Sequence, residues 1–472
     1  MANLPLGNSE SDYDSKKSRG RLINMIPEGD KKGYKSVRSA EGLTLFTTGM
    51  EAPMRSNLLV NGGYIYLVSG TKFYRIDSTG ASTALGTVNG SGQARLAANA
   101  IPGDSQIVIL NGSGVGYIYS VALGFLTITD TDFFSSSSVT VLNERFWFVR
   151  DGTSEIFGSD VSDGTSYNPL TFATAEESPD LMKCIIRKGS SLYLLGEQTT
   201  EIWQSIDDIT LPIRKVNGAT KEWGIIAKDS LAEANDAFVF LANDRTVRLI
   251  QNNQIIEISD LDFTLKVKGN GTNTFPGFTK IDDAIGFFVD GPIHKTYYLT
   301  FPSEGYTWGY DLNTGLTHTR ESEGLGYWRA NGATLFNSKI ICGDLIEGKL
   351  WILDPSNKTE NGSIMRRTLI TPSISTDKNI TIPLVEFDME VAQHNDPSLD
   401  PQMMNYFSRD GGNTWIQRES ISLGAYGDFR ARVSLRQFGR LVRNKDFCLK
   451  LEVTDAVGLQ FYGAQFYPEV DM

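Results

Sequence analysis

A pair of apolar runs recurs about seven times between Tyr64 and Asp354. Each copy has one apolar run, a short polar or glycine-containing turn, and a second run that often carries an aromatic residue. The first runs are residues 63–67, 107–110, 146–149, 192–195, 238–241, 297–301 and 340–342. Six steps over 276 residues give a period of about 46, close to the roughly 40–50 residues of a β-propeller blade.

Polar turns that follow two of these units predict further strands. Residues 77–80 and 311–315 each place an Asp and a Gly after the second run, which suits a turn into another strand of a four-stranded blade. We therefore predict an all-β chain whose main body, residues 41–372, is a β-propeller of about seven blades. Because the copies are uneven, six or eight blades also fit. By analogy with other propellers, we expect a strand at residues 43–47 to complete the last blade.

The two ends of the chain differ from this repeat. The last hundred residues hold six alternating segments, at 380–391, 404–408, 415–420, 430–435, 447–453 and 459–467. This spacing predicts a small β-sandwich over residues 373–472, with a linker at 373–379. Residues 1–40 are polar and charged around an apolar patch at 22–26. They predict an extended N-terminal arm that becomes ordered on a partner or on its own domain.

Composition narrows the chemistry. A net charge of −12 argues against general affinity for nucleic acid phosphates, although an acidic channel wall would let DNA slide past. Three cysteines, Cys184, Cys342 and Cys448, have no CxxC spacing, so we expect them to be buried. Membrane-length apolar runs and a signal peptide are also missing, so we expect a soluble protein not secreted by that route.

Catalytic patterns are scarce. The three histidines, His294, His318 and His394, form no HExxH or HxH pattern. A glycosidase would need a pair of carboxylates at the propeller mouth. Glu176, Glu177 and Asp180 are acidic neighbours in a loop, but a solvated loop explains them better. We therefore predict no catalytic residues, no metal site and no cofactor, and we expect that the protein is not an enzyme.

One local motif predicts a capped turn. Residues 408–415 (SRDGGNTW) fit the pattern SxDxGxTW, which resembles the Asp-box turns of sialidases. In such a turn the Asp side chain accepts from the turn amides, and Gly permits the bend. The motif is structural and predicts a stable β-hairpin.

A basic cluster stands out near the C-terminus. Six basic residues occur without an acidic one, namely Arg430, Arg432, Arg436, Arg440, Arg443 and Lys445. They could form an exposed strand face paired with carboxylates such as Asp428 and Asp446. Alternatively, they could form a docking surface for an acidic partner or a neighbouring copy of the chain.

A series of short motifs runs in order along nearly the whole chain. They are residues 23–28 (INMIPE), Arg38 with Gly42 and Leu43, residues 151–153 (DGT), residues 175–180 (AEESPD) leading to 200–203 (TEIW), and residues 438–443 (FGRLVR) ahead of 447–451 (FCLKL). In this order and spacing the chain resembles the packaged DNA stabilisation proteins, or tail hub proteins, of short-tailed bacteriophages.

The resemblance implies a structural role in the virion tail. Such proteins form a homo-oligomeric ring, a hexamer, below the portal and its adaptor ring, after assembly in the host cytoplasm. They continue the DNA channel, retain the packaged genome, and receive the tail needle and the fibres or spikes. DNA would pass through without sequence-specific binding.

Two other classes of function stay open at this point. One is a carbohydrate-binding or glycan-hydrolysing propeller, and the other is a propeller scaffold for cellular protein partners. Hydrolysis of a glycan panel would favour the first, and monomeric behaviour without adaptor binding would favour the second.

Overall fold

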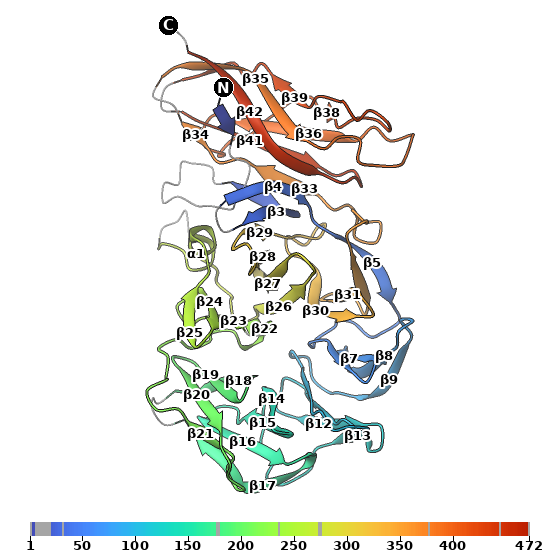
Figure 1. Cartoon of the computed structure of the whole chain (residues 1–472), viewed down its shortest axis with the longest axis vertical. Helices are drawn as coiled ribbons and strands as arrows, with labels where there is room; N and C mark the ends of the chain where they lie inside the picture. Colours follow the sequence, from blue (N-terminus) through green and yellow to red (C-terminus); the bar gives the residue numbers. More distant parts are fainter. Residues whose placement is uncertain are drawn as a thin grey trace.

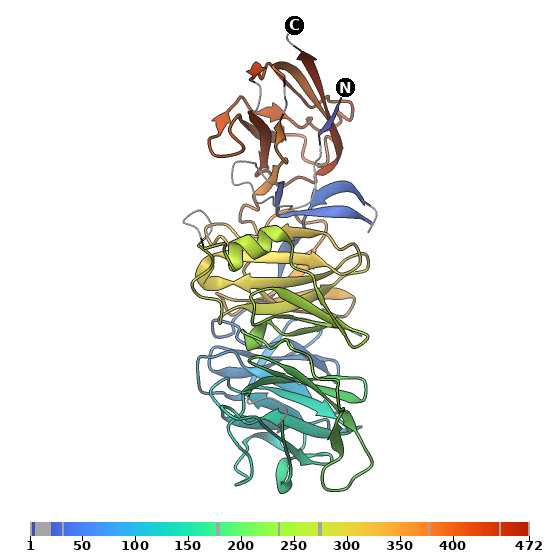
Figure 2. The ribbon, with the colours of Figure 1, turned by 90° about the vertical axis from the view of Figure 1, so that its left-hand side faces the viewer.

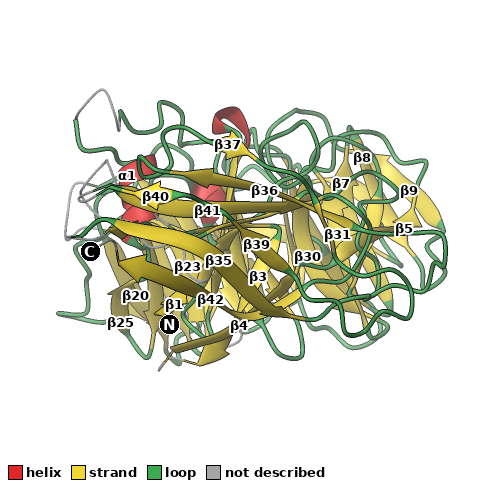
Figure 3. Ribbon diagram, turned by 90° about the horizontal axis from the view of Figure 1, so that it is seen from above, coloured by secondary structure: helices red, strands yellow, loops and turns green. Residues whose placement is uncertain are grey.

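Four-stranded antiparallel sheets repeat along the first three quarters of the chain. The structure, a computed structural model, describes residues 2–4, 20–30, 33–175, 180–234, 237–271, 276–375, 378–442 and 445–470. Within these ranges strands and loops predominate, and the helical elements are α1 (Leu261–Val267), η1 (Lys228–Ser230) and η2 (Pro302–Glu304) (Figure 3). The predicted all-β class is confirmed.

Five of these sheets follow one another in chain order. Blades one and two are β6 (Leu59–Asn61), β7 (Tyr64–Ser69), β8 (Lys72–Ile76), β9 (Ser82–Thr87), and β10 (Arg95–Ala98), β11 (Ile107–Leu110), β12 (Gly116–Ser120), β13 (Gly124–Thr127). Blade three is β14 (Val139–Leu142), β15 (Arg145–Val149), β16 (Glu155–Asp160) and β17 (Asp163–Thr174). Blades four and five are β18 (Met182–Lys188), β19 (Ser191–Gly196), β20 (Thr200–Ser205), β21 (Ile213–Lys215), and β22 (Ala232–Ala234), β23 (Ala237–Leu241), β24 (Val247–Gln251), β25 (Gln254–Glu257).

The last two blades complete a propeller of seven. Blade six is β26 (Ile285–Asp290), β27 (Lys295–Phe301), β28 (Tyr306–Asp311) and β29 (Thr317–Thr319). Blade seven is β30 (Ala330–Phe336), β31 (Lys339–Asp344) and β32 (Leu350–Asp354), to which the N-terminal β5 (Gly42–Thr47) adds the outer strand. Leu43 pairs with Leu353 and Gly42 with Asp354, so the predicted closure by residues 43–47 is confirmed.

The middle strands of each blade are apolar because both of their faces are covered by neighbouring blades. All five residues of β15, Arg-Phe-Trp-Phe-Val, are buried, whereas the outer strand β9 is largely exposed. Aromatic rings fill the space between blades, as where Phe73 of blade one meets Tyr119 of blade two at 5.6 Å between centroids. Gly86 faces the ring of Phe125, which a Cβ would meet at 2.2 Å, so this packing requires glycine.

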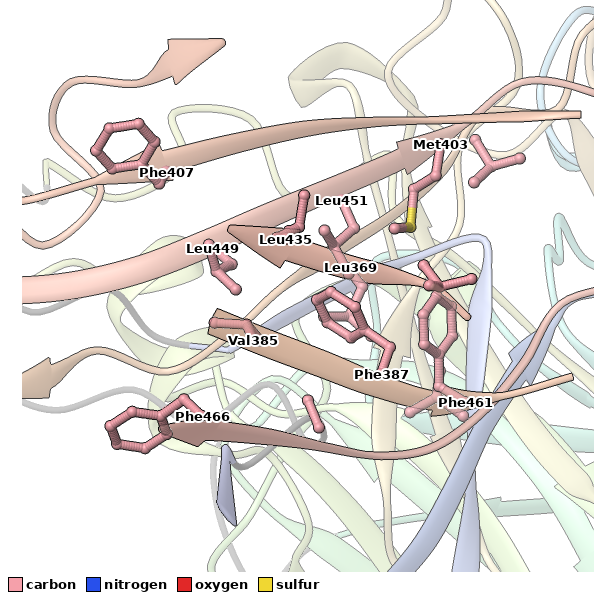
Figure 4. Close-up of a cluster of buried hydrophobic side chains, with 14 of the residues drawn as sticks. Leu369, Val385, Phe387, Met403, Phe407, Leu435, Leu449, Leu451, Phe461 and Phe466 are labelled. Carbon is pink, nitrogen blue, oxygen red and sulfur yellow. The ribbon is translucent and has the colours of Figure 1, made fainter. Parts of the chain in front are cut away.

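A β-sandwich lies at one end of the long axis, with the propeller below it (Figure 1). Its strands are β33 (Arg367–Ile370), β34 (Ile374–Ser375), β35 (Ile380–Met389), β36 (Gln402–Ser408), β37 (Ile416–Gln417), β38 (Ile421–Ser422), β39 (Ser434–Arg436), β40 (Arg440–Leu441), β41 (Asp446–Val453) and β42 (Gln460–Val470). The core lies between two sheets: Val385, Phe387, Leu435, Phe461 and Phe466 on one side face Leu369, Met403, Phe407, Leu449 and Leu451 on the other (Figure 4). The predicted sandwich is confirmed.

The N-terminal segment supplies strands to both parts. β3 (Met25–Asp30) and β4 (Gly33–Ser39) form a hairpin whose second strand pairs with β42, and the hairpin lies between sandwich and propeller (Figure 2). β1 (Ala2–Leu4) also pairs with β42. Leu22, Met25 and Val37 are buried in the sandwich core. The described residues of the arm are therefore strands of the sandwich, and the predicted domain boundaries at 40 and 372 stay predictions.

The strand β2 (Arg21–Ile23) joins the two parts through hydrogen bonds. It pairs in parallel with β29 of blade six and antiparallel with β33 of the sandwich. Because β33 continues to β41 and β36, one eleven-stranded sheet runs from the propeller into the sandwich. We call β2 the bridging strand.

Asn24, next to the bridging strand, fixes this connection. It is fully buried and left-handed, with φ at 53°, a conformation that Asn tolerates better than most residues. Its amide Nδ2 donates to the carbonyls of Glu321 at 2.9 Å and Arg366 at 2.8 Å. Its Oδ1 accepts from the Glu321 amide at 3.1 Å. One side chain therefore ties the end of blade six to the start of the sandwich.

Candidate assembly surfaces

The predicted basic residues lie along one edge of the sandwich. Arg436 is on β39 and Arg440 on β40, two short strands that both pair with β35. Arg430 and Arg432 are in the loop before β39, and Lys445 precedes β41; all five are exposed. Arg443 lies outside the described residues. Val433, Leu435, Phe438 and Leu441 alternate with them and are buried in the core, which turns the basic side chains outward.

Carboxylates do not neutralise most of this edge. Among the ion pairs within the described ranges, none involves Arg430, Arg432, Arg436 or Lys445, and neither Asp428 nor Asp446 takes part in one of them. The interpretation of a strand face paired with those two carboxylates is therefore not supported. Arg436 lines a surface groove of ≈ 900 Å³ between β39 and the segment of β37 and β38, two short strands that both pair with β36.

Exposed apolar residues accompany these basic residues. In the loop 425–432, Tyr426 is 55% and Phe429 is 67% exposed, directly beside Arg430 and Arg432. Aromatic residues and arginine together are the composition of protein interfaces. The sequence analysis missed the two aromatics, although the run YGDFRAR at 426–432 carries the signal. We call residues 426–432 the aromatic–arginine loop.

The propeller's own channel is narrow and crossed by an ion pair. Its wall is built from the first strand of each blade and encloses ≈ 720 Å³. Arg95 on β10 of blade two donates to Asp229 at 3.2 Å and to the Lys228 carbonyl at 3.1 Å, and both acceptors precede blade five. Duplex DNA is at least about 16 Å across. Because the Arg95–Asp229 pair joins blade two to the segment before blade five, the channel has no open bore of that width.

A charged cavity lies where the arm hairpin meets blades six and seven. It measures ≈ 470 Å³. His294 Nδ1 lies 2.8 Å from Asp311 Oδ2, and Arg38 bridges Glu28 at 2.9 Å and Glu41 at 2.7 Å. Burial raises the pKa of Asp311, but hydrogen bonds from His294, Asn313 and Thr314 outweigh this and hold that pKa below its usual value.

This cavity does not assemble a nucleophile. For a His–Asp pair to activate a nucleophile of the protein, a hydroxyl or thiol must lie within hydrogen-bond reach of the imidazole. The Ser39 hydroxyl at the cavity wall instead accepts from the Leu459 amide at 3.0 Å, which fastens β4 to the segment before β42. The charged residues therefore hold the arm hairpin against blade six.

The remaining candidate groups are structural. His318 is fully buried against the Tyr298 hydroxyl at 2.9 Å, and burial lowers its pKa to about 3. His394 Nε2 contacts the Gly424 carbonyl. The three cysteines are buried, as predicted, and form no disulfide with one another, and burial raises the pKa of Cys184 and of Cys342 to about 12.

The motif at 408–415 folds as the predicted capped turn. Asp410 accepts from the Thr414 amide at 2.9 Å and the Thr414 hydroxyl at 2.6 Å. Together with a bond from Ser408, these lower the pKa of Asp410 to about 2. The turn joins β36 to β37.

The acidic residues considered for a glycosidase site form no such site in the described residues. Asp180 is buried, and its carboxylate accepts hydrogen bonds from the amides of residues 197–199. Glu176 and Glu177 lie outside the described ranges.

The described residues contain no group of three or more His, Cys, Asp or Glu side chains placed to hold a metal ion. Their helices are also too short to cross a membrane.

Comparison with solved structures finds distant likenesses. The chain is similar to a streptogramin B lyase (13% identity, TM-score 0.41, covering 71% of this chain and 96% of that chain). It is also similar to virginiamycin B lyase from Staphylococcus aureus (11%, TM-score 0.42, 71% and 99%) and to BamB from Moraxella catarrhalis (12%, TM-score 0.40, 75% and 97%). Likenesses this distant carry no argument about function. A search of curated proteins finds no match.

Family models cover both parts of the chain. The model described as "Bacteriophage P22 Gp10, beta-propeller" matches residues 3–264, more than half of the chain. The model described as "Bacteriophage P22 Gp10, beta-sandwich" matches residues 366–467, which are the sandwich from β33 into β42. These matches confirm the resemblance found in the sequence. The chain belongs to the bacteriophage P22 Gp10 family of phage stabilisation proteins.

Proposed function

We propose that copies of this chain form a ring, a hexamer, that serves as the hub or nozzle of a short phage tail. Family membership makes the chain a structural protein of the phage tail. In the proposed role the ring sits below the portal and adaptor, continues the DNA channel, retains packaged DNA, and docks the needle and the fibres or spikes. Assembly takes place in the host cytoplasm.

The observation that carries this proposal is the exposed basic edge of the sandwich, in a chain whose sandwich and propeller share one continuous sheet. The bridging strand makes propeller and sandwich one continuous sheet, so a contact made by the sandwich orients the whole propeller. Unpaired Arg430, Arg432 and Arg436 project from that sandwich. Arginine suits such contacts because its planar fork bonds a carboxylate twice.

The DNA path of the proposed ring runs between copies. The channel within each propeller is too small for a duplex and is crossed by the Arg95–Asp229 pair. A passage wide enough for DNA must therefore be enclosed by several chains. The acidic balance of the chain suits a wall along which a polyanion slides without being held.

Electron microscopy of the protein mixed with a portal and adaptor assembly tests this function. We expect a ring of copies beneath the adaptor, with propellers around an open centre. A variant with Arg430, Arg432 and Arg436 changed to Ser should fold as a monomer and form few rings. Replacement of Lys72, Lys280 and Lys339, which are surface lysines of the propeller, by Ser is the matched control and should leave rings unchanged. The absence of any ring with the unaltered chain would refute the hub function.

A further inference from the structure

A small apolar cavity opens at the far end of the propeller from the sandwich. It measures ≈ 210 Å³ and lies on blade three between β16, β17 and the loop before β14. Phe134, Phe157, Pro169 and Phe172 supply its apolar wall. Sites for small molecules usually measure about 300–1,000 Å³, so this cavity suits a single large side chain. We call it the blade-three cavity.

The surface around this cavity is more apolar than an ordinary solvated surface. β17 is the outer strand of its sheet, and Leu170 and Phe172 on it are 63% and 48% exposed. Ile209, in the loop between β20 and β21, is 93% exposed. This loop lies against blade three, because the Thr171 hydroxyl donates to the Thr210 carbonyl at 3.0 Å. Apolar residues gathered in this way mark protein contacts.

The same end of the molecule is acidic. Residues 121–175 contain seven acidic and two basic residues. Both basic residues already face a carboxylate, since Arg150 lies 2.6 Å from Glu155 and Arg145 lies 3.9 Å from Asp160. Asp132 lines the cavity, and its carboxylate makes no hydrogen bond or ion pair within the described part of the chain. The charged residues that line the cavity are Asp132, Glu155 and Arg150, and Arg150 pairs with Glu155, so the lining keeps one unpaired negative charge on a blade that is acidic as a whole.

The aromatic–arginine loop has the complementary properties. It presents an exposed Phe429 and Tyr426 flanked by Arg430 and Arg432. It belongs to the sandwich, whereas β17 lies at the opposite end of the long axis (Figure 1). The loop of one chain therefore cannot reach the blade-three cavity of the same chain.

We propose that the aromatic–arginine loop of one copy docks on the blade-three cavity of the next copy, with Phe429 in the cavity and Arg430 and Arg432 against the acidic surround. The proposal rests on the hub function and names the partner of its basic edge. Each copy contributes two different surfaces to such a head-to-tail contact. A contact of this kind builds a ring when its rotation closes.

Sedimentation equilibrium of the purified chain measures this contact. Phe429→Ala should weaken association between copies about 30-fold, the effect of removing a central aromatic anchor. Leu335→Ala is the matched control, because Leu335 is 63% exposed on blade seven and away from both surfaces. It should leave association unchanged. An equal effect of the two substitutions would overturn the proposal.

Charge reversal tests the pairing of the two surfaces. Arg432→Glu and Asp132→Lys should each weaken association at least 10-fold, and the chain carrying both should recover most of it, because the reversed charges again meet as opposites. Failure of the double variant to recover would overturn the proposal. Both positions are on the surface, and circular dichroism confirms that the variants are folded.

The same variants in the electron microscopy assay separate this proposal from the hub function. Rings that form equally well with Phe429→Ala and Asp132→Lys would overturn the proposed contact and leave the hub function intact. If the unaltered chain forms no ring on the adaptor, the hub function fails, and recovery of association by the double reversal would still establish the head-to-tail contact.

Discussion

Replacing Asn24 should loosen the joint between the propeller and the sandwich. Asn24→Ala removes two donated hydrogen bonds, to the carbonyls of Glu321 and Arg366, and one accepted from the Glu321 amide. The site is fully buried, so water cannot replace them. Each lost bond to a buried backbone group costs about 1–2 kcal/mol, and alanine in the left-handed conformation adds about 1 kcal/mol. The expected destabilisation is therefore about 4–7 kcal/mol.

Chemical denaturation and hydrogen exchange together measure this effect. The loss should appear as a lower denaturation midpoint and as faster exchange in the peptides that contain β29 and β33, while peptides from blade three keep their protection. If propeller and sandwich then unfold in separate steps, the transitions are fitted separately.

Asn24→Gly is the control that separates backbone strain from the lost bonds. Glycine accepts a positive φ without strain but makes none of the three side-chain bonds. We expect it to lose about 3–6 kcal/mol through the missing bonds alone. A glycine variant as stable as the unaltered chain would refute the reasoning, because the side-chain bonds would then contribute nothing.

Three further substitutions test other parts of the fold. Arg55→Met should destabilise the propeller by about 3–5 kcal/mol in urea denaturation, because four backbone carbonyls lose the hydrogen bonds that the buried guanidinium donates to them. These are the carbonyls of Gly70, Val88, Gly92 and Asn111, and a loss below about 1 kcal/mol would contradict this reasoning. Gly42→Val should open blade seven and expose β32 to proteolysis, since even a Cβ would lie 2.3 Å from the Thr359 carbonyl; Leu45→Val on the same strand is the control. His318 has a folded pKa of about 3, below the ordinary 6.5, so the unfolded chain binds its proton first and stability falls by up to about 1.4 kcal/mol per unit as pH drops from 6.5. His318→Gln should remove that share of the pH slope in thermal unfolding between pH 6.5 and 5, and an unchanged slope would show that His318 is not its source.

The propeller could be predicted because its signal is local. Each hairpin repeats in sequence, and the middle strands, such as residues 107–110 and 146–149, are buried on both faces and read as continuous apolar runs. Strand 43–47 was predictable because a propeller needs an outer strand for its last blade. The cysteines follow the same logic, since each lies inside an apolar run.

The joint between the two parts could not be predicted. The apolar patch at 22–26 marks burial, but no local pattern indicates that Ile23 pairs with Thr319 or that Leu22 pairs with Leu369. The partners are 296 residues away for Ile23 (319 − 23) and 347 residues away for Leu22 (369 − 22). Pairing at that range depends on which sheet edges the finished domains leave open, and a single sequence does not state this.

The candidate surfaces show the same limit. The basic residues are visible in sequence, yet two predicted strands there are mostly loop, with only Ile416–Gln417 and Ser434–Arg436 paired. The alternation at 415–420 misled because that segment buries none of its side chains, so it has no face packed on the core. The blade-three cavity gathers residues from Asp132 to Phe172 and became visible only when blade three was folded.

The bridging strand and β5 also set the order in which the chain can be finished. Both precede their partners in the chain, which are β32 for β5, and β29 and β33 for the bridging strand, while the hairpin beside them pairs with β42. β5 therefore stays unpaired until β32 (Leu350–Asp354) has been made, the bridging strand has both partners only after β33 (Arg367–Ile370), and the hairpin waits for β42 (Gln460–Val470), as expected for pairings that are distant in sequence. A chain cut short before β42 would lack part of the sandwich sheet. Translation itself thus works as a checkpoint, because only a chain synthesised through β42 can complete both parts of the body.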